Sequence, residues 1–235
     1  MAEHIETQVP CKGYDITADW YESESDNIVL VLPGYMSRKE RQVDLASAIA
    51  VKGANVLVAD LSGHGTSQIP LEATTPAQHL METVCTLDML AKEHPGKRVS
   101  VMGTSYGAFL AAYASRFRDF HRLLLRTPAI YRPQDLYTSS TVIDRKYTAE
   151  VYRHDITVVS QHPLFRQEPV FTGETLVVVH AEDEDVPQAT SDVYVQAFDA
   201  QSFVVPGFRH SSHDPANPPG DMDAYRDRIA AWLNA

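Results

Sequence analysis

Short apolar runs alternate along most of the chain with longer segments of helical period. Apolar runs that are nearly continuous, rather than alternating, indicate strands that are buried on both faces of a sheet. Because strands and helices alternate, we expect parallel strands joined by helical crossovers. The predicted strands are Ile28–Leu32, Asn55–Ala59, Val99–Met102, Leu123–Arg126, Leu176–His180 and Ser202–Val205.

The segments between these strands carry ordinary helix signals at their ends. Thr75 is a predicted N-cap, and Pro76 follows it at the first helical position. Gly53 and Gly96 stand where the chain leaves a helix. The predicted helices are Glu40–Lys52, Pro76–Glu93, Tyr106–Phe117, Gln188–Phe198 and Met222–Leu233.

Two segments depart from this alternation. Ile5–Pro10 and Tyr14–Tyr21, on either side of Lys12 and Gly13, predict an antiparallel hairpin. Residues 127–173 contain four prolines and short helical patches, and such long segments are usually lids or binding loops. We therefore expect one domain, residues 1–235, of the α/β class: a mostly parallel central sheet, helices on both faces, and a short lid insertion at about 127–173.

Composition and charge narrow the classes of function. The chain of 235 residues is 44% hydrophobic and 22% charged, which is typical of a folded globular protein. Its formal charge of −11 disfavours a broad basic face, so nucleic acid is not an expected partner. The longest apolar runs are much shorter than the roughly 20 residues that cross a bilayer, so no membrane span is expected.

The cysteines and the N-terminus indicate a cytoplasmic protein. Cys11 and Cys85 lie far apart and have neither the spacing of a disulfide framework nor that of a zinc site. Met1–Gln8 lacks the basic start, apolar middle and small-residue cleavage site of a secretory signal. The oligomeric state is not determined by the sequence, and a homodimer stays open.

The strongest chemical signal is the segment Gly103–Gly107, which follows a predicted strand and begins a predicted helix. A serine at such a sharp turn, Ser105, has a strained backbone, and glycines two positions to either side let strand and helix pack closely. The helix N-terminus would present amide groups to a developing oxyanion. We interpret Ser105 as a nucleophile; the alternative is a chance motif in which Ser105 only caps the helix.

A second donor to the oxyanion is expected where the first parallel strand ends. Gly34 would let the backbone turn inward there, and the amide of Tyr35 would then join the amide of Tyr106. The alternative is a simple Pro-Gly turn that ends the strand.

An acid and a histidine follow two later strands. Asp183 is the predicted partner of the histidine and Asp185 the reserve, although a solvated acidic turn is the alternative. His210 is the predicted base and His213 its competitor, which completes the chain order serine, acid, histidine. A metal site at His210, His213 and Asp214 lacks a further well-spaced ligand, so we expect no metal.

With these motifs, the chain resembles the α/β-hydrolase superfamily over residues 25–235 apart from the lid, and within it small esterases, monoacylglycerol-lipase-like and feruloyl-esterase-like enzymes. Asp60–Ser67 is similar to an Asp-x-x-Gly-His-Gly-x-Ser turn of that family, in which Asp60 and His64 would be scaffold. Pro33 stands before Gly34 where many members have histidine. The resemblance implies hydrolysis of an ester, thioester or amide through an acyl-enzyme, without a cofactor.

The predicted function is thus a serine hydrolase that cleaves a small-molecule carboxylic ester or thioester. The alternative is a non-hydrolytic protein of the same fold: an acyltransferase, a lyase, a haloperoxidase or a binding protein. Arg126, at the end of its strand, is a candidate for binding a substrate carboxylate, with pairing to a local acid as the alternative. Aromatic residues of the insertion suggest an apolar acyl pocket, with ordinary packing as the alternative: Tyr131, Tyr137, Tyr147, Tyr152, Phe165 and Phe171.

Overall fold

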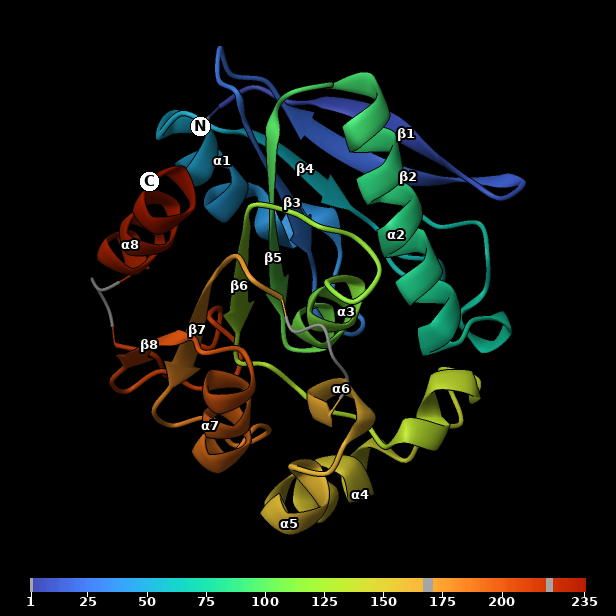
Figure 1. The fold of residues 1–235 in the computed structure, drawn as a ribbon, viewed down its shortest axis with the longest axis vertical. Helices are drawn as coiled ribbons and strands as arrows, with labels where there is room; N and C mark the ends of the chain where they lie inside the picture. The colour runs from blue at the N-terminus through green and yellow to red at the C-terminus, as the bar shows by residue number, and fades with distance from the viewer. Residues whose placement is uncertain (1, 167–170, 219–221) are drawn as a thin grey trace.

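An eight-stranded sheet forms the centre of the computed structural model, which describes residues 2–166, 171–218 and 222–235 (Figure 1). Its strand order is β1-β2-β4-β3-β5-β6-β7-β8. The pairs β1–β2 and β2–β4 are antiparallel, and all other neighbours are parallel. The strands are β1 (Ile5–Cys11), β2 (Tyr14–Tyr21), β3 (Asn27–Leu32), β4 (Asn55–Ala59), β5 (Arg98–Thr104), β6 (Arg122–Arg126), β7 (Glu174–His180) and β8 (Gln201–Val205).

The predicted hairpin and all six predicted parallel strands are present, and the predicted mostly parallel central sheet is confirmed. Lys12 and Gly13 form the hairpin turn with positive φ angles of 42° and 101°. The antiparallel pairing of β2 with β4 adds the hairpin to the edge of the parallel sheet. Six parallel strands therefore end at one edge of the sheet.

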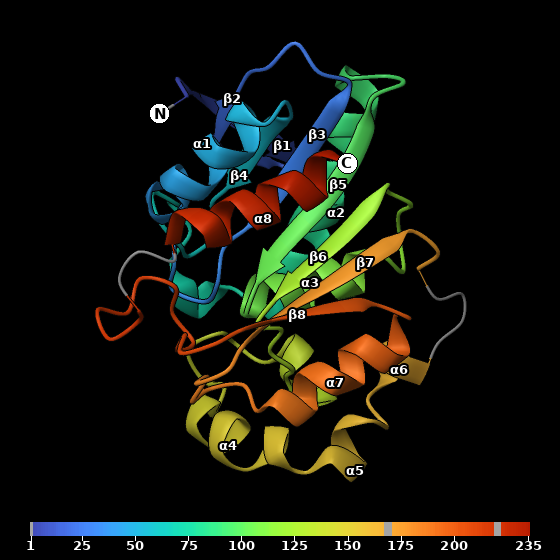
Figure 2. The ribbon, with the colours of Figure 1, turned by 90° about the vertical axis from the view of Figure 1, so that its left-hand side faces the viewer.

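Helices cover both faces of the sheet (Figure 2). On one face, α1 (Val43–Val51) and α8 (Met222–Asn234) pack over alternate side chains such as Val29 and Val31. On the other face, α2 (Pro76–Glu93), α3 (Tyr106–Ala114) and α7 (Gln188–Ala197) pack over Leu30 and Leu32. The two cores explain why the strand sequences are continuously apolar.

Two predicted helices differ from the observed ones by more than one residue at an end. The expected helix Glu40–Lys52 begins as the 3₁₀ helix η1 (Lys39–Gln42) and becomes α-helical only at Val43. The Lys39 amide donates to Asp60 Oδ1 (2.8 Å) and its ammonium to Asp19 (2.7 Å), which fixes the first turn. The predicted helix Tyr106–Phe117 ends at Ala114, where i→i−3 bonds tighten the last turn.

Short helices make up most of the predicted insertion, of which residues 167–170 lie outside the described residues. Residues 145–166 gather at one end of the molecule, below the sheet in Figure 1. Another short helix, η2 (Leu71–Ala73), precedes α2. The helices of the insertion are η3 (Pro133–Tyr137), α4 (Arg145–Glu150), η4 (Tyr152–His154), α5 (Ile156–Val159) and α6 (Pro163–Arg166).

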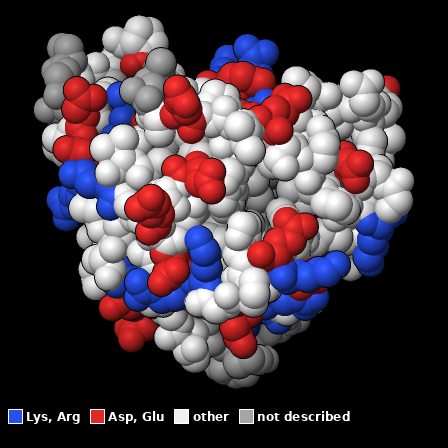
Figure 3. Space-filling view, turned by 90° about the horizontal axis from the view of Figure 1, so that it is seen from above, with Lys and Arg blue, Asp and Glu red and all other residues white. Residues whose placement is uncertain are grey.

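The surface shows charges of both signs. On the face seen from above in Figure 1, Lys and Arg side chains lie beside Asp and Glu side chains (Figure 3). Within the described part of the chain, no helix combines the length and apolar character that crossing a membrane requires.

Candidate active site

Ser105 lies at the turn between β5 and α3, with the strained backbone that the motif predicts. Its φ and ψ angles are 51° and −110°, a conformation that costs a non-glycine residue about 1–3 kcal/mol. The Ser105 amide donates to the carbonyl of Arg126 (2.8 Å), and the Ser105 carbonyl accepts from the Ala129 amide (3.3 Å). Bonds to the neighbouring strand and to the chain after it thus hold the turn in place.

The glycines of the motif permit close packing around this turn. A Cβ atom on Gly103 would lie 2.3 Å from the carbonyl oxygen of Gly107. A Cβ atom on Gly107 would lie 2.1 Å from the carbonyl oxygen of Leu32, at the end of β3. Strand and helix therefore approach as closely as predicted, and a side chain at either position would collide with backbone.

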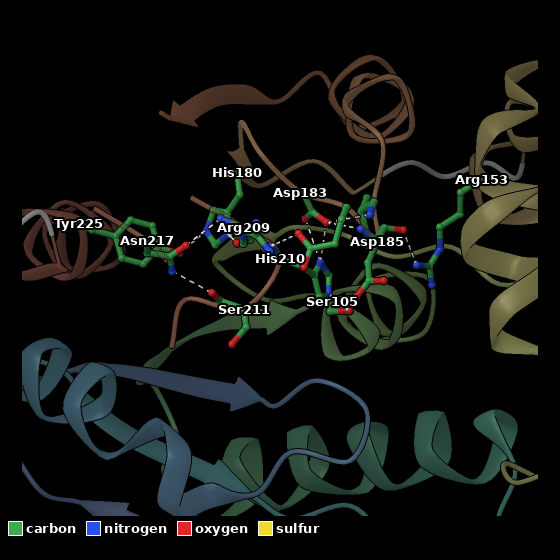
Figure 4. Close-up of polar contacts among 12 residues, drawn as sticks. Ser105, Arg153, His180, Asp183, Asp185, Arg209, His210, Ser211, Asn217 and Tyr225 are labelled. Atoms are coloured by element: carbon green, nitrogen blue, oxygen red, sulfur yellow. Dashed lines mark hydrogen bonds and ion pairs between the residues drawn. The ribbon is translucent and has the colours of Figure 1, made fainter. Parts of the chain in front are cut away.

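His210 bridges the serine and an acid (Figure 4). Its Nε2 atom lies 2.9 Å from Ser105 Oγ, and its Nδ1 atom lies 2.8 Å and 2.9 Å from the two oxygens of Asp183. A carboxylate only accepts hydrogen bonds, so Nδ1 carries the proton and Nε2 is left to accept from the serine hydroxyl. This arrangement suits transfer of the serine proton to the imidazole.

Asp183 is placed and oriented by its own loop. The Asp183 side chain is 3% exposed, and Oδ1 accepts hydrogen bonds from the amides of Asp185 (2.9 Å) and Val186 (2.8 Å). The reserve candidate Asp185 is 53% exposed, and its carboxylate is 3.9 Å from Nε2 of His210. The structure therefore places Asp183, and not Asp185, against the Nδ1 atom of His210.

The competitor His213 points elsewhere. Its Nε2 atom bonds to the carbonyl of Arg41 (3.1 Å), and the residue is exposed. His210, by contrast, is bonded to Ser105 and Asp183. Among the described residues, no group of three His, Cys, Asp or Glu side chains is arranged to hold a metal ion.

Residues that the sequence analysis did not single out hold the His210 loop. Asn217 accepts from the Arg209 amide (2.8 Å) and donates to the Ser211 carbonyl (2.9 Å), so it bonds to the backbone on both sides of His210. His180, the last residue of β7, bonds to the Arg209 carbonyl through Nδ1 (2.6 Å). The loop that presents His210 is therefore fixed at three backbone groups.

His180 holds this position as a neutral ring. Burial, and then the charge of Arg126, lower the pKa of His180 to about 4. Nδ1 must donate to the Arg209 carbonyl, so Nε2 accepts from the Tyr225 hydroxyl of α8 (2.9 Å). The sequence places His180 at the end of a predicted strand. Its hydrogen-bond partners, Arg209 and Tyr225, lie 29 and 45 residues later in the chain, so no local sequence pattern indicates these bonds.

The two predicted oxyanion donors flank Ser105. A Cβ atom on Gly34 would lie 3.7 Å from Ser105 Cβ, so the backbone before Tyr35 runs close to the serine. Within the described structure, the Tyr35 amide has no hydrogen-bond acceptor. The Tyr106 amide is at the first position of α3, where no intrahelical acceptor exists.

Buried polar contacts fix the rings of both tyrosines. The Tyr106 hydroxyl is 2.6 Å from Nδ1 of His79, whose Nε2 donates to the Ser62 carbonyl (2.9 Å). Burial lowers the pKa of His79 to about 4, so this ring is neutral and Nδ1 accepts from the hydroxyl. The Tyr35 hydroxyl donates to the carbonyl of Ser140 in the insertion (3.0 Å).

Asp60 and His64 are buried beside this region and do not line the cavity over Ser105. Asp60 accepts from the amides of Lys39 (2.8 Å) and Thr66 (3.2 Å). His64 bonds to the Ser62 carbonyl (3.0 Å), and its ring packs edge-on against Tyr35 at 5.5 Å. Both residues therefore bond to the backbone of the turn Asp60–Ser67.

A cavity of about 820 Å³ opens over Ser105. The loops after β3 and β8 and the insertion line it, and Arg126 also lies in its wall. The proposed aromatic acyl pocket finds little support, because Tyr131 alone of the six insertion aromatics lines this cavity. Tyr152, Phe165 and Phe171 pack in the core, and Tyr137 and Tyr147 are exposed, so ordinary packing and surface positions account for them.

Solved structures similar to the chain share its fold at low identity. A ferulic-acid-bound Est1E from Butyrivibrio proteoclasticus is 16% identical with a TM-score of 0.72, covering 97% of each chain. The Pyrococcus furiosus esterase Pf2001 is 18% identical with a TM-score of 0.70, covering 99% of this chain and 92% of the esterase. XC6422 from Xanthomonas campestris, described as a serine hydrolase without lid, is 15% identical with a TM-score of 0.69, covering 99% and 96%.

Sequence comparison identifies the family. No curated protein matches the chain at a significant level. The model of the family described as "Serine aminopeptidase, S33" matches residues 23–151, which is more than half of the chain and includes the Ser105 turn. The structural neighbours agree with this match, since one is described as an a/b serine hydrolase and another as an esterase. The chain therefore belongs to the S33 serine aminopeptidase family of α/β hydrolases.

Proposed function

We propose that this hydrolase cleaves carboxylic esters through an acyl-enzyme formed on Ser105. The observation that carries the proposal is the 2.9 Å contact between Ser105 Oγ and His210 Nε2, with Asp183 on the opposite ring nitrogen. Membership of a hydrolase family and the fold shared with esterases support it. Ester cleavage needs a nucleophile, a base and an oxyanion site, and all three have candidates at this edge of the sheet.

Acylation begins when the Ser105 hydroxyl attacks the ester carbonyl and His210 takes its proton at Nε2. The amides of Tyr35 and Tyr106 bind the oxyanion of the tetrahedral intermediate, where loss of one donor typically costs about 3–4 kcal/mol. Asp183 stabilises the imidazolium that forms. The C–O bond to the alcohol then breaks, and His210 returns the proton to the departing alcohol.

Deacylation repeats these steps with water. His210 removes a proton from a water molecule, which attacks the acyl group on Ser105. The same two amides bind the second oxyanion, and the proton then passes from Nε2 to Ser105 Oγ as the acid leaves. The cycle uses no group beyond these residues and water.

The insertion is proposed to act as a lid over the site. Residues Tyr131, Arg145 and Arg153 contribute side chains to the wall of the cavity. The Arg153 guanidinium donates to the carbonyls of Ile130 (3.2 Å) and Asp185 (2.8 Å), which ties the insertion to the acid loop. Such a cover excludes water from the reacting groups.

Replacement of the nucleophile tests the proposal. Ser105→Ala is expected to lower the hydrolysis of p-nitrophenyl acetate by at least about 10⁴-fold, because the acyl-enzyme can no longer form. A fluorophosphonate probe should label wild-type protein at Ser105 and leave the variant unlabelled. Ser202→Ala, at an exposed position of β8, is the matched control and should retain both properties.

Two outcomes would contradict the proposal. A folded Ser105→Ala protein that keeps its turnover would exclude Ser105 as the nucleophile. Absence of both ester hydrolysis and probe labelling in the wild type would favour a non-hydrolytic protein. Because the family description names an aminopeptidase, amino-acid p-nitroanilides are assayed in parallel, and a preference for them would replace esters with amides as the substrate class.

A further inference from the structure

The cavity over Ser105 carries more positive than negative side chains, although the chain as a whole has a charge of −11. Three acidic residues line it: Glu150, Glu184 and Asp185. Five basic residues line it, and none of these forms an ion pair within the described chain: Arg41, Arg126, Arg145, Lys146 and Arg153. Basic side chains elsewhere often form ion pairs, for example Arg118 with Asp88 and Arg226 with Asp44.

Arg126 is the most unusual of these five. The residue is only 5% exposed, and its Nε atom has no hydrogen-bond partner in the described structure. The guanidinium lies beside the Tyr225 hydroxyl, where it opposes the rise that burial causes in the pKa of Tyr225. A buried cation without a carboxylate in ion-pair distance is costly, because no bonded opposite charge offsets the loss of its hydration.

The surroundings of Arg126 are suited to an anion. A second, much smaller cavity lies beside one end of this cavity, here called the Arg126 end. Both cavities are lined by Arg41, Gln42, Arg126, Ser212 and His213. The carboxylate of Asp44, which lines the smaller cavity, bonds to Arg226 at 2.8 Å. Two guanidinium groups at this end therefore lack a carboxylate partner among the described residues, and hydroxyl, amide and imidazole groups stand beside them.

This end of the cavity is next to the nucleophile. Arg126 is the last residue of β6, pairs with Thr104 across the sheet, and accepts the Ser105 amide at its carbonyl (2.8 Å). Ser105 and Arg126 line the same cavity, so one small molecule can contact both the nucleophile and the guanidinium. A guanidinium presents two parallel N–H groups, which match the two oxygens of a carboxylate.

We propose that the substrate is an ester that carries a carboxylate, on its acyl or its alcohol part, and that Arg126 binds this carboxylate. The proposal rests on the proposed ester hydrolysis and names the class of ester. Arg126 thereby selects substrates, while Ser105 and His210 carry out the reaction on the adjacent carbonyl. Arg41, at the same end, adds a second positive charge.

Matched ester pairs test this selection. One pair differs in the acyl part, mono-p-nitrophenyl glutarate against p-nitrophenyl valerate; the other differs in the alcohol part, 3-acetoxybenzoate against phenyl acetate. For at least one pair, wild-type kcat/KM should favour the anionic ester by about tenfold or more, because hydrogen bonds to charged groups contribute about 10- to 100-fold. The favoured pair tells whether the acyl or the alcohol part carries the carboxylate.

Substitution of Arg126 connects the preference to this residue. Arg126→Gln should reduce the ratio of kcat/KM for anionic over neutral ester at least tenfold, and Arg126→Lys should give an intermediate ratio. The substitution could also disturb Tyr225 and, through it, His180. Such a general loss of activity would affect both esters equally and cancel in the ratio. Arg98→Gln, at the exposed start of β5, removes the same charge far from the site and should leave the ratio unchanged.

Binding of glutarate, measured by calorimetry, separates this proposal from the hydrolytic one. Wild-type protein should bind glutarate at least tenfold more tightly than the uncharged glutaramide, and Arg126→Gln should lose the difference, whether or not esters are cleaved. Ester hydrolysis with no preference in either pair overturns the carboxylate proposal and leaves the hydrolase. Glutarate bound no better than glutaramide also overturns the carboxylate proposal. If Arg126→Gln does not fold, Arg126→Lys and the wild-type comparison still decide.

Discussion

Asp183 and Asp185 lie two residues apart, yet they meet His210 in different ways. Asp183 is buried, bonds to Nδ1 and accepts from two backbone amides, whereas Asp185 is half exposed and its carboxylate lies 3.9 Å from Nε2. The sequence left this choice open because both residues follow the same strand. The choice depends on the direction of each side chain, which the tight Asp183–Val186 turn determines.

Substitution of each acid by its amide distinguishes the two roles. Asp183→Asn should lower kcat for p-nitrophenyl acetate by about 10³- to 10⁴-fold, because the amide can no longer hold the imidazole in the reactive tautomer or stabilise its charge. Asp185→Asn should change kcat by no more than about threefold. Its carboxylate is exposed, and water largely screens its charge at 3.9 Å from Nε2 of His210. Steady-state kinetics at pH 7.5 checks both values, and a larger loss in Asp185→Asn would reverse the assignment.

At the level of elements, the close approach of β3, β5 and α3 holds the Ser105 turn in place. The motif predicts this packing, because glycines two residues to either side of a serine leave room for backbone on both sides. The spacing of Gly103 and Gly107 was readable from the sequence. The atoms that they contact belong partly to β3, about 75 residues earlier in the chain, and only the assembled sheet reveals them.

Gly107→Ala tests the importance of this packing. The added Cβ would meet the carbonyl oxygens of Leu32 and Pro33 at 2.1 Å and 2.5 Å, and backbone cannot move aside as a flexible side chain can. We expect a loss of about 3 kcal/mol in the free energy of unfolding and at least a tenfold loss of kcat/KM. Urea denaturation and ester hydrolysis measure the two effects.

Gly96→Ala is the control for this substitution. A Cβ atom on Gly96 would meet nothing within 4 Å. Alanine at this position should therefore lower the free energy of unfolding by only about 1 kcal/mol, through the positive φ of 85°. Activity should stay at the wild-type level because Gly96 precedes β5 at the end far from Ser105. Equal losses of stability and activity in the two variants would show that collision at Gly107 is not what matters.

For the whole molecule, the alternation of apolar runs and helical segments was sufficient to predict the sheet, its helices and the edge at which the candidate site residues meet. Parallel strands end at one edge, so residues that follow different strands, such as Ser105, Asp183 and His210, converge there. The position of the hairpin beside β4 and the bonds of His180 were not predictable, because both depend on contacts between distant segments. Periodicity reports which face is buried, but not which polar groups meet in the interior.

Three histidines in that interior make the molecule sensitive to acid. Burial lowers the pKa of His79, His162 and His180 to about 4 each, whereas an unfolded chain has a histidine pKa of about 6.5. Above pH 6.5 both states are neutral at these rings. Between pH 6.5 and 4 the unfolded chain binds protons that the folded chain does not, so the free energy of unfolding falls as the pH falls.

The expected loss is up to about 2 kcal/mol per buried histidine between pH 7.5 and pH 5, and urea denaturation at intervals across this range measures it. His162→Asn should make the slope of stability against pH shallower by about one third of the combined contribution of His79, His162 and His180, because its amide oxygen replaces Nδ1 as the acceptor for Leu164 without titrating. His154→Asn removes an exposed histidine and should leave the slope nearly unchanged. Equal slopes in the wild type and the His162 variant would mean that the ring of His162 is protonated as readily in the folded chain as in the unfolded one.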